Sequence, residues 1–533
     1  MKSKTAAKKI LGEVPFSADL YWLFRRSQEP PTKNYYLDKL ENSLPDWVDQ
    51  VSNSHYQSET PGKRILLFAA LHYWISHITL VGSILSGLGN EVEIVYLPYA
   101  RWDEPINRFD LRRQDLYSKR VLENAKPILN STSLLDVKAI EDQMPEQIAA
   151  MVAEVSLRDT QYTKQVEVVD RDEDLYKLRV ARNSEAALKA IALMKDKKPD
   201  VVIIPNGSIL EMGVFYQVAR FLEIPTITYE FGEQRNRIWL ALNKEVMRQE
   251  TDELWAINKD LSITNNQLEK VEELFSSRQK ADLWNNFSRR WQTIPSQGGE
   301  LVRQELNLDH RPVMVLAANV IGDSLTLGRQ MFSRSMSEWL EHTVKFFAEK
   351  SNLQLVVRIH PGERYTKGPS VSEIVNQTLQ FIPENIHLIE AADQTNTYDL
   401  FEIADLGLVY TTTVGLEMAM SGIPVLVAGQ THYRGKGFTF DPISWEEYFN
   451  LLSSFEQDRK SFQLSDDQVR LAWHYAYSFF FEYPAPFPWP MPHFWKDLDE
   501  WPIDRVFSAE GIEMYGDTFR YLAGEPRDWT IKN

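Results

Sequence analysis

The chain contains no cysteine among its 533 residues. This absence excludes a disulfide framework, a thiolate zinc site and a cysteine nucleophile, and it is typical of proteins from a reducing compartment. No stretch reaches the roughly 18–20 uninterrupted apolar residues of a membrane-spanning helix. No apolar segment follows the basic first residues, as a signal peptide would require. We therefore expect a cytoplasmic protein and leave open a peripheral place at the inner face of the cell membrane.

An excess of positive charge is also missing, because the formal net charge is −17. A nucleic-acid partner needs a basic face, so this balance argues against one while still allowing local basic pockets for phosphates. The composition, 43% apolar and 12% aromatic, is that of a globular protein. A chain of this length exceeds one ordinary core, so we expect two domains.

Apolar runs alternate with helical patterns in two separate parts of the sequence. Continuous apolar runs indicate strands that are buried on both faces of a parallel sheet. In the first part the expected strands are 64–70, 91–97, 199–205 and 224–229, and in the second part they are 312–318, 354–359, 387–390, 406–410 and 424–427. The pattern predicts an α/β fold of two Rossmann-like domains that face one another across a cleft, with helical N- and C-terminal extensions.

The expected boundaries follow from where these patterns begin and end. We predict an N-terminal extension, a first Rossmann-like domain, a helical connecting region, a second Rossmann-like domain, and a helical and aromatic tail that packs back across the domains. These segments span residues 1–60, 61–250, 251–310, 311–460 and 461–533, respectively.

The most informative motif follows the strand expected at 406–410. Three threonines, Thr411, Thr412 and Thr413, come directly after the strand and begin a helix that contains Glu417. Hydroxyls and backbone N–H groups at a helix N-terminus can bind an anion, and Glu417 could accept hydrogen bonds from a ribose. The alternative is an ordinary capped helix. The whole spacing favours a phosphate-and-ribose site, and with it an enzyme that uses a nucleotide sugar.

A second motif, Arg358-Ile359-His360-Pro361, lies where another expected strand ends. Ligands of open α/β sheets bind at the carboxyl ends of strands, so Arg358, His360 and Pro361 are in the expected place. The imidazole could donate to a phosphate or act as an electrostatic clamp. The alternative is a histidine that only caps the strand end.

Two further loops follow strands at the same edge of the second sheet. Arg434 and Lys436 lie in a glycine-containing loop and could close over a diphosphate or a sugar carboxylate, although a solvated basic loop is the alternative. The other loop, Gly322-Asp323-Ser324, could contact a diphosphate or could simply cap a helix.

In the first domain, a carboxylate or a histidine could act as general base. The candidates are His77, Glu211 and Glu230, and for each the alternative is a turn or capping residue. Asp170-Arg171-Asp172 has the Asp-x-Asp spacing of a metal and diphosphate site, but its acidic surroundings favour a solvated loop. The aromatic and proline-rich segment 479–495 is interpreted as packing, with a membrane or oligomer contact as the alternative.

With these residues in hand, the chain resembles the bacterial capsule polysaccharide biosynthesis proteins, which are related to capsule Kdo transferases and, more distantly, to polysialyltransferases. The resemblance is clearest over residues 312–442 and rests on the runs NVIGDS, RIHPGE, TTTVGLEMAMSGIPV and THYRGKGFT. It implies a GT-B fold with the donor in the C-terminal domain and the acceptor in the N-terminal domain. It also implies no obligatory metal and no cofactor beyond the nucleotide sugar.

The resulting hypothesis is a glycosyltransferase that moves a sugar from a nucleotide-activated donor to a surface polysaccharide or lipid-linked glycan. Two alternatives stay open: a nucleotide-sugar epimerase or alditol-phosphate transferase on the same fold, and a non-catalytic glycan-binding or export-scaffold protein. The expected partners are the donor and the acceptor. Contact with the membrane or with polysaccharide export machinery is left open.

Overall fold

The computed structural model describes residues 2–25, 34–54, 61–139, 144–232, 234–282 and 294–530. The chain forms two compact units. Unit 1 comprises residues 1–160, 170–247 and 485–528, and unit 2 comprises residues 161–169, 248–484 and 529–533. The expected tail, 461–533, is thus divided, since its first part belongs to unit 2 and most of the remainder to unit 1.

Unit 1 contains a seven-stranded sheet in the order β12-β6-β5-β4-β1-β2-β3. Strands β1 to β5 are parallel, and β6 and β12 pair antiparallel at one edge. The strands are β1 (Arg64–Ala70), β2 (Glu91–Leu97), β3 (Asn130–Ser133), β4 (Val201–Pro205), β5 (Thr226–Phe231), β6 (Arg237–Leu242) and β12 (Ala485–Pro486). Six of the seven residues of β1 are buried, as expected for a strand with helices on both faces.

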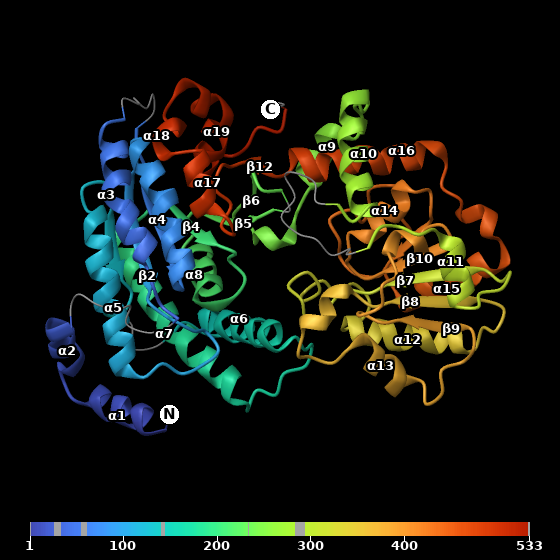
Figure 1. Ribbon diagram of the computed structural model, residues 1–533, viewed down its shortest axis with the longest axis horizontal. Coiled ribbons are helices and arrows are strands. Elements are labelled where there is room, and N and C mark those ends of the chain that lie inside the picture. The colour runs from blue at the N-terminus through green and yellow to red at the C-terminus, as the bar shows by residue number, and fades with distance from the viewer. Residues whose placement is uncertain are drawn as a thin grey trace. The chain divides into compact units, whose positions relative to one another are not determined.

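Helices from both ends of the chain join this sheet (Figure 1). Those that follow or connect its strands are α4 (His72–Gly87), α5 (Arg108–Leu122), α6 (Glu146–Lys164), α7 (Asp174–Lys197) and α8 (Leu210–Phe221). The others are α1 (Lys2–Glu13), α2 (Ser17–Arg25) and α3 (Asp38–Ser52) from the N-terminal part, and α17 (Phe494–Glu500), α18 (Ile503–Val506) and α19 (Ala509–Leu522) from the C-terminal part. One apolar core includes side chains from α3, β1 and α19, so both terminal regions contribute to the stability of unit 1.

Unit 2 contains a five-stranded, fully parallel sheet in the order β11-β10-β7-β8-β9. Its strands are β7 (Val313–Ala317), β8 (Gln354–Arg358), β9 (Ile386–Ile389), β10 (Leu406–Val409) and β11 (Val425–Val427). After β7 the chain passes to β8 on one side, and later to β10 on the other. The order of strands therefore reverses at β7, and this is the position at which open α/β sheets bind ligands.

Four helices of unit 2 alternate with the strands or follow them (Figure 1): α12 (Met336–Ala348), α13 (Val371–Thr378), α14 (Val414–Met420) and α15 (Trp445–Gln457). The unit also contains α9 (Asp252–Asn258), α10 (Asn265–Gln279), α11 (Gly299–Glu305) and α16 (Asp466–Tyr477). A 3-10 helix, η3 (Pro361–Tyr365), follows β8, and η4 (Thr397–Leu400) precedes β10. The predicted fold class, two Rossmann-like α/β domains with helical extensions, is confirmed.

The aromatic segment 479–495 is buried, as the packing interpretation predicts. Its buried side chains are Phe479, Phe480, Tyr483, Phe487, Trp489 and Phe494. Trp489 donates its indole N–H to the Trp501 carbonyl at 2.8 Å, which satisfies its polar atom away from water. These rings are therefore not available for a membrane or oligomer contact.

Candidate functional site

The carboxyl edge of the unit 2 sheet brings together loops that are far apart in the sequence. The side-chain oxygen of Asn319, in the loop after β7, accepts a hydrogen bond of 3.1 Å from the backbone N–H of Thr411, in the loop after β10. Both residues are buried. This bond joins the two loops at the point where the strand order reverses, next to the residues that end β8.

Arg358 is the last residue of β8, and its guanidinium is buried. It donates to the carbonyl oxygens of Glu390, at 2.7 Å, and Thr395, at 3.2 Å, while its Nε has no hydrogen-bond partner. Burial lowers the pKa of Arg358 to about 10, because removal from water disfavours the cation; Asp393 opposes this shift. Even so, the side chain is a cation at neutral pH. An anion is the ligand that would complete its hydrogen bonding.

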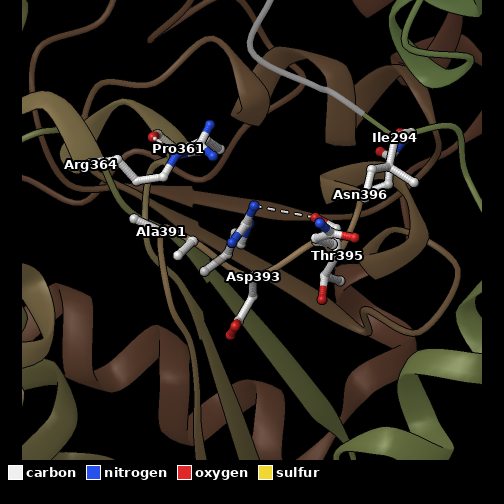
Figure 2. Close-up of a pocket in the computed structure, with 10 residues that line it drawn as sticks. Ile294, Pro361, Arg364, Ala391, Asp393, Thr395 and Asn396 are labelled. Atoms are coloured by element: carbon white, nitrogen blue, oxygen red, sulfur yellow. Dashed lines mark hydrogen bonds between the residues drawn. The ribbon is translucent and has the colours of Figure 1, made fainter.

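A small hollow that is partly open to solvent lies around Arg358. It is lined by Ile294, Arg358, Pro361, Arg364 and residues 391–396. Figure 2 shows Arg364 and Pro361 on one side of this hollow and Asn396 and Ile294 on the other. Two guanidinium groups and one carboxylate, that of Asp393, belong to the lining, so its formal charge is positive. We call this the Arg358 hollow.

His360 follows β8 and caps η3. Its Nδ1 accepts a hydrogen bond of 3.0 Å from the backbone N–H of Gly362, so the neutral ring carries its hydrogen on Nε2. Burial, together with the positive charge of Arg358, lowers the pKa of His360 to about 4. At neutral pH the imidazole is therefore an uncharged hydrogen-bond donor. Of the two roles expected from the sequence, donation to a phosphate fits this state and an electrostatic clamp does not. Pro361, at the first position of η3, is buried beside it.

The threonine turn differs from the expected row of free donors. The N–H of Thr411 is used by Asn319, and the Thr412 carbonyl accepts from the Tyr433 hydroxyl at 2.6 Å. Thr413 stands at the start of α14 without a side-chain capping bond, and α14 is only seven residues long. The hydroxyl of Thr411 is buried and has no hydrogen-bond partner, so it can donate to a ligand. The roles expected for Thr412 and Thr413 stay a prediction.

The loop Gly322-Asp323-Ser324 is explained by local packing. Gly322 has a φ of +70°, and a Cβ at this position would lie 2.5 Å from the backbone nitrogen of Val166. The Asp323 carboxylate accepts from the backbone N–H of Ser324 at 2.7 Å. The glycine is therefore required by the approach of residues 165–166. Asp323 and Ser324 lie in a turn and cap no helix, since α12 begins at Met336 with Ser335 as its cap, and their contact with a diphosphate stays a prediction.

Glu417 is bonded to other side chains of unit 2. It is buried, forms an ion pair with Arg278, and accepts a hydrogen bond of 3.1 Å from the Tyr398 hydroxyl. The guanidinium of Arg278 also lies over the Phe480 ring, 4.9 Å from its centroid. Both carboxylate oxygens are thus engaged within unit 2. These contacts favour a structural role, and the expectation that Glu417 holds the ribose stays a prediction.

Arg434 and Lys436 are likewise turned into the protein. Arg434 donates to the carbonyl oxygens of Val427 and Pro442, which fixes the loop to the end of β11. The buried Lys436 forms an ion pair with Asp252 and lies 6.0 Å from the centroid of the Tyr475 ring. These contacts favour a structural role for the two cations, and their closing over a diphosphate or a sugar carboxylate stays a prediction.

His77 lies in the core of unit 1. Its Nδ1 is 2.9 Å from the Tyr229 hydroxyl, and its Nε2 donates to the Trp489 carbonyl at 2.9 Å. Burial lowers the pKa of His77 to about 4. Because the ring is fully buried and both nitrogens are bonded, the hypothesis that it acts as general base is corrected to a core role.

Glu211 belongs to a buried ionic cluster at the start of α8. Arg179 forms ion pairs with both Glu211, at 3.1 Å, and Asp159. Burial raises the pKa of Asp159 to about 6, which the charge of Arg179 opposes. All three side chains are inaccessible to solvent. Glu211 is thus a partner of Arg179, and its expected role as base is also corrected.

Glu230 is the remaining candidate base, and it lies near the carboxyl end of β5. Its Oε2 accepts from the Asn206 side chain at 3.1 Å, and its Oε1 accepts from the backbone N–H of Phe231 at 3.1 Å. Asn206 follows β4, so Glu230 lies at the carboxyl edge of the unit 1 sheet. Its role as base stays a prediction.

The sequence reasoning missed part of the Arg358 hollow. Arg364 follows the RIHPGE run directly, and its Nε donates to the Pro361 carbonyl at 3.0 Å. A basic residue directly after that run is a sequence signal by which Arg364 could have been found. The loop 391–396 after β9 carried no such signal, because its contribution is made largely by backbone carbonyls.

The described residues contain no grouping of three His, Asp or Glu side chains suited to a metal ion. The expectation that no metal is required stays a prediction. Asp170 and Asp172 lie in an exposed turn, where the backbone N–H of Asp172 donates to the Asp170 carboxylate at 2.9 Å. Within the described ranges, no helix is both long and apolar enough to span a bilayer.

Fold and site together define a Rossmann-like α/β protein with a positively charged hollow at the carboxyl edge of one sheet. Residues 289–477 match the family described as capsule polysaccharide biosynthesis protein. The resemblance to this family is therefore confirmed, and the matching segment, about a third of the chain, includes the whole Arg358 hollow and Thr411. Among curated proteins, none matches the chain.

Several solved structures are similar to the chain at low identity. The β-Kdo 2,4-transferase KpsC of Thermosulfurimonas dismutans is 16% identical over 51% of this chain and 79% of its own, with a TM-score of 0.33. The S. aureus MnaA structure with UDP is 12% identical over 77% and 91%, with a TM-score of 0.28. A Neisseria meningitidis UDP-GlcNAc 2-epimerase bound to UDP-GlcNAc is 12% identical over 79% and 99%, with a TM-score of 0.24. Similarity at these TM-scores carries no argument about the activity.

Proposed function

We propose that the protein is a glycosyltransferase that moves a sugar from a nucleotide-activated donor to a capsule-type polysaccharide or lipid-linked glycan. The observation that carries the proposal is the Arg358 hollow. Within the described part of the chain, no carboxylate forms an ion pair with the buried Arg358, and its Nε has no partner. A buried cation without a direct ion-pair contact is costly, and a bound phosphate would offset that cost. The family match covers the segment that contains this hollow and supports a role in capsule polysaccharide synthesis.

The donor's phosphate groups would occupy the hollow between Arg358 and Arg364. The guanidinium groups donate charge-assisted hydrogen bonds to phosphate oxygens, and the neutral His360 adds its Nε2 hydrogen. The Thr411 hydroxyl offers a further hydrogen bond at the same edge of the sheet. Negative charge increases on the leaving phosphate as the bond to the sugar breaks. These hydrogen-bonding groups would therefore stabilise the transition state more than they stabilise the bound nucleotide sugar.

In the transfer, the bond between the anomeric carbon and a phosphate oxygen breaks, and a bond from that carbon to an acceptor hydroxyl oxygen forms. The hydroxyl proton passes to a base, and the electron pair of the broken bond remains on the nucleotide phosphate. Glu230 is the base that we propose, because its carboxylate lies at the carboxyl edge of the unit 1 sheet, where Asn206 donates to it.

The proposal is tested by thermal unfolding of the purified protein with UDP, GDP, CDP, CMP and dTDP in turn. A nucleotide at about 100 times its dissociation constant should stabilise the protein by roughly 2.7 kcal/mol. We expect one nucleotide class to raise the midpoint in the wild type but not in His360→Ala. The control is His342→Ala, which removes an exposed imidazole on α12 of the same unit. Absence of any shift would favour the non-catalytic alternative.

Turnover then separates the enzyme classes. The matching nucleotide sugar is incubated with and without an extract of lipid-linked glycans, and free nucleotide is measured. Release of nucleotide that depends on the extract supports sugar transfer. An altered sugar on an intact nucleotide, formed without the extract, supports the epimerase alternative. Transfer of the sugar together with a phosphate supports the alditol-phosphate transferase alternative.

A further inference from the structure

The two N-terminal helices of unit 1 are attached to α5, beside which they lie in Figure 1. In α2, Asp19 forms an ion pair with Arg112 at 2.8 Å, and the Trp22 and Tyr117 rings lie 6.2 Å apart. In α1, Lys8 forms an ion pair with Asp110 at 2.9 Å. These contacts define the faces of α1 and α2 that pack on the protein.

The outer face of α2 is apolar. Phe16, Leu20, Leu23 and Phe24 are 77%, 55%, 55% and 86% exposed. Phe16 lies in the turn just before α2, and the spacing of three and one residues places Leu20, Leu23 and Phe24 on one stripe of the helix, while Ala18 and Trp22 lie on the packed side. A helix with apolar residues on the face that points away from its protein has a surface that still needs a partner.

The stripe continues on α1 and in the turn between the helices. Ile10, Leu11 and Val14 are also exposed, so seven large apolar side chains are exposed within fifteen residues. Elsewhere in the described chain, exposed apolar side chains are scattered along the sequence, for example Phe381 and Ile443. Scattered residues need no explanation, whereas a contiguous group marks an interaction surface. We call this group the α1–α2 surface.

The charge around this surface has the opposite sign to that of the whole chain. Residues 2–25 contain five basic and two acidic residues. The basic residues of α5 beneath them are engaged in ion pairs, for example Arg113 with Asp110 and Arg120 with Glu41, so the excess of positive charge is that of residues 2–25. The full chain carries a net charge of −17. An anionic surface would therefore attract this region and repel most of the remainder, which would orient the protein as it approaches.

We propose that the α1–α2 surface docks onto an anionic lipid bilayer. The apolar stripe enters the boundary between headgroups and acyl chains, and basic residues of α1, Lys9 among them, contact lipid phosphates. The helices lie on the bilayer and do not cross it, in agreement with the absence of a spanning helix from the described ranges. This proposal rests on the N-terminal helices alone and is independent of the proposed glycosyl transfer.

The test is flotation of the full-length protein with vesicles of two compositions. One contains equal parts of phosphatidylglycerol and phosphatidylcholine, and the other contains phosphatidylcholine alone. We expect the wild type to float with the anionic vesicles and to bind the neutral ones at least about tenfold more weakly, because both apolar insertion and charge attraction contribute.

Three variants test the residues. Leu20→Ser with Phe24→Ser should reduce binding to anionic vesicles by about tenfold or more, since two exposed apolar side chains of the stripe are lost. Lys9→Glu should weaken anionic binding only. Phe381→Ser, which removes an exposed apolar ring from unit 2, should bind as the wild type does. Circular dichroism and thermal unfolding check that every variant is folded.

Two outcomes would overturn the proposal. One is equal flotation of the wild type and the Leu20→Ser/Phe24→Ser variant, because binding would then not use this surface. The other is absence of flotation combined with a dimer in solution that becomes monomeric in the same variant, because a second copy of the chain would then be the partner of the α1–α2 surface.

Discussion

Asn319 and Thr411 join the two loops at which the strand order of the unit 2 sheet reverses. The Asn319 side-chain oxygen accepts a 3.1 Å hydrogen bond from the Thr411 N–H, although 92 residues separate them. This bond holds the Thr411 hydroxyl, which has no partner of its own, at the carboxyl edge of the sheet. Asn319 thus contributes to the proposed nucleotide-sugar site by positioning Thr411.

Asn319→Ala should weaken nucleotide binding and destabilise unit 2. The buried Thr411 N–H would lose its acceptor, and an unsatisfied buried group of this kind costs about 1–3 kcal/mol. Urea unfolding gives the loss of stability, and nucleotide titration gives the loss of affinity. Asn376→Ala, at an exposed position on α13, serves as control and should change neither. Unchanged stability in Asn319→Ala would show that the loops are held by other contacts.

Glu417→Gln distinguishes a structural role from ribose binding. The substitution removes the carboxylate that pairs with Arg278. Removal of one partner from a buried ion pair costs about 3–5 kcal/mol of stability. Because Arg278 is partly exposed, the loss of stability should be about 3 kcal/mol or less. We expect a lower unfolding midpoint and a nearly normal shift on addition of nucleotide. A normal midpoint with a lost nucleotide shift would support the ribose role.

The fold was predictable where burial leaves a continuous apolar run. The sequence places β1 and β2 at their observed limits, because both are buried in the middle of a parallel sheet. It misses β6, and it also misses the two edge strands, β3, whose sequence is NSTS, and β12, which has two residues. Edge strands such as these need little apolar surface and form because a neighbour offers hydrogen bonds, which the local sequence does not record.

The site was predictable to the extent that the strand ends were. Arg358 and His360 follow a recognisable strand, and the rule for α/β sheets places them at the binding edge. Glu417 and Lys436 also follow strands, but their charges are neutralised by Arg278 and Asp252, each more than a hundred residues away. Only tertiary contacts reveal which charged side chains have a partner within the protein and which are left for a ligand.

The pH dependence of stability should carry a contribution from His77. Its pKa is about 4 in the folded protein and near 6.5 when unfolded, so between these values the unfolded state binds the additional proton. Stability therefore falls as the pH drops from about 6.5 to 4, by about 3 kcal/mol for this group. The measurement is the unfolding midpoint against pH for the wild type and His77→Gln. The variant should lose part of the slope in this window.

The matched control for this measurement is His310→Gln, which removes an exposed imidazole and should leave the slope unchanged. His360 has a similarly lowered pKa, so the His77 variant should retain a part of the acid sensitivity. A slope in His77→Gln equal to that of the wild type would contradict a buried, neutral His77.

Glu230→Gln should separate catalysis from donor binding. The amide keeps nearly the shape of the carboxylate and can still accept from Asn206, but it cannot take a proton. General bases contribute about 10²–10⁴-fold in rate, so transfer should fall by a factor in that range. The nucleotide-induced thermal shift should be unchanged, because the proposed nucleotide site lies in unit 2.

Glu245→Gln is the comparison for Glu230→Gln. It removes a carboxylate that is paired with Arg158 in unit 1, so stability should fall while the transfer rate of the folded enzyme is maintained. If Glu230→Gln transfers sugar at the wild-type rate, the base is another group and Glu230 only fixes the turn after β4.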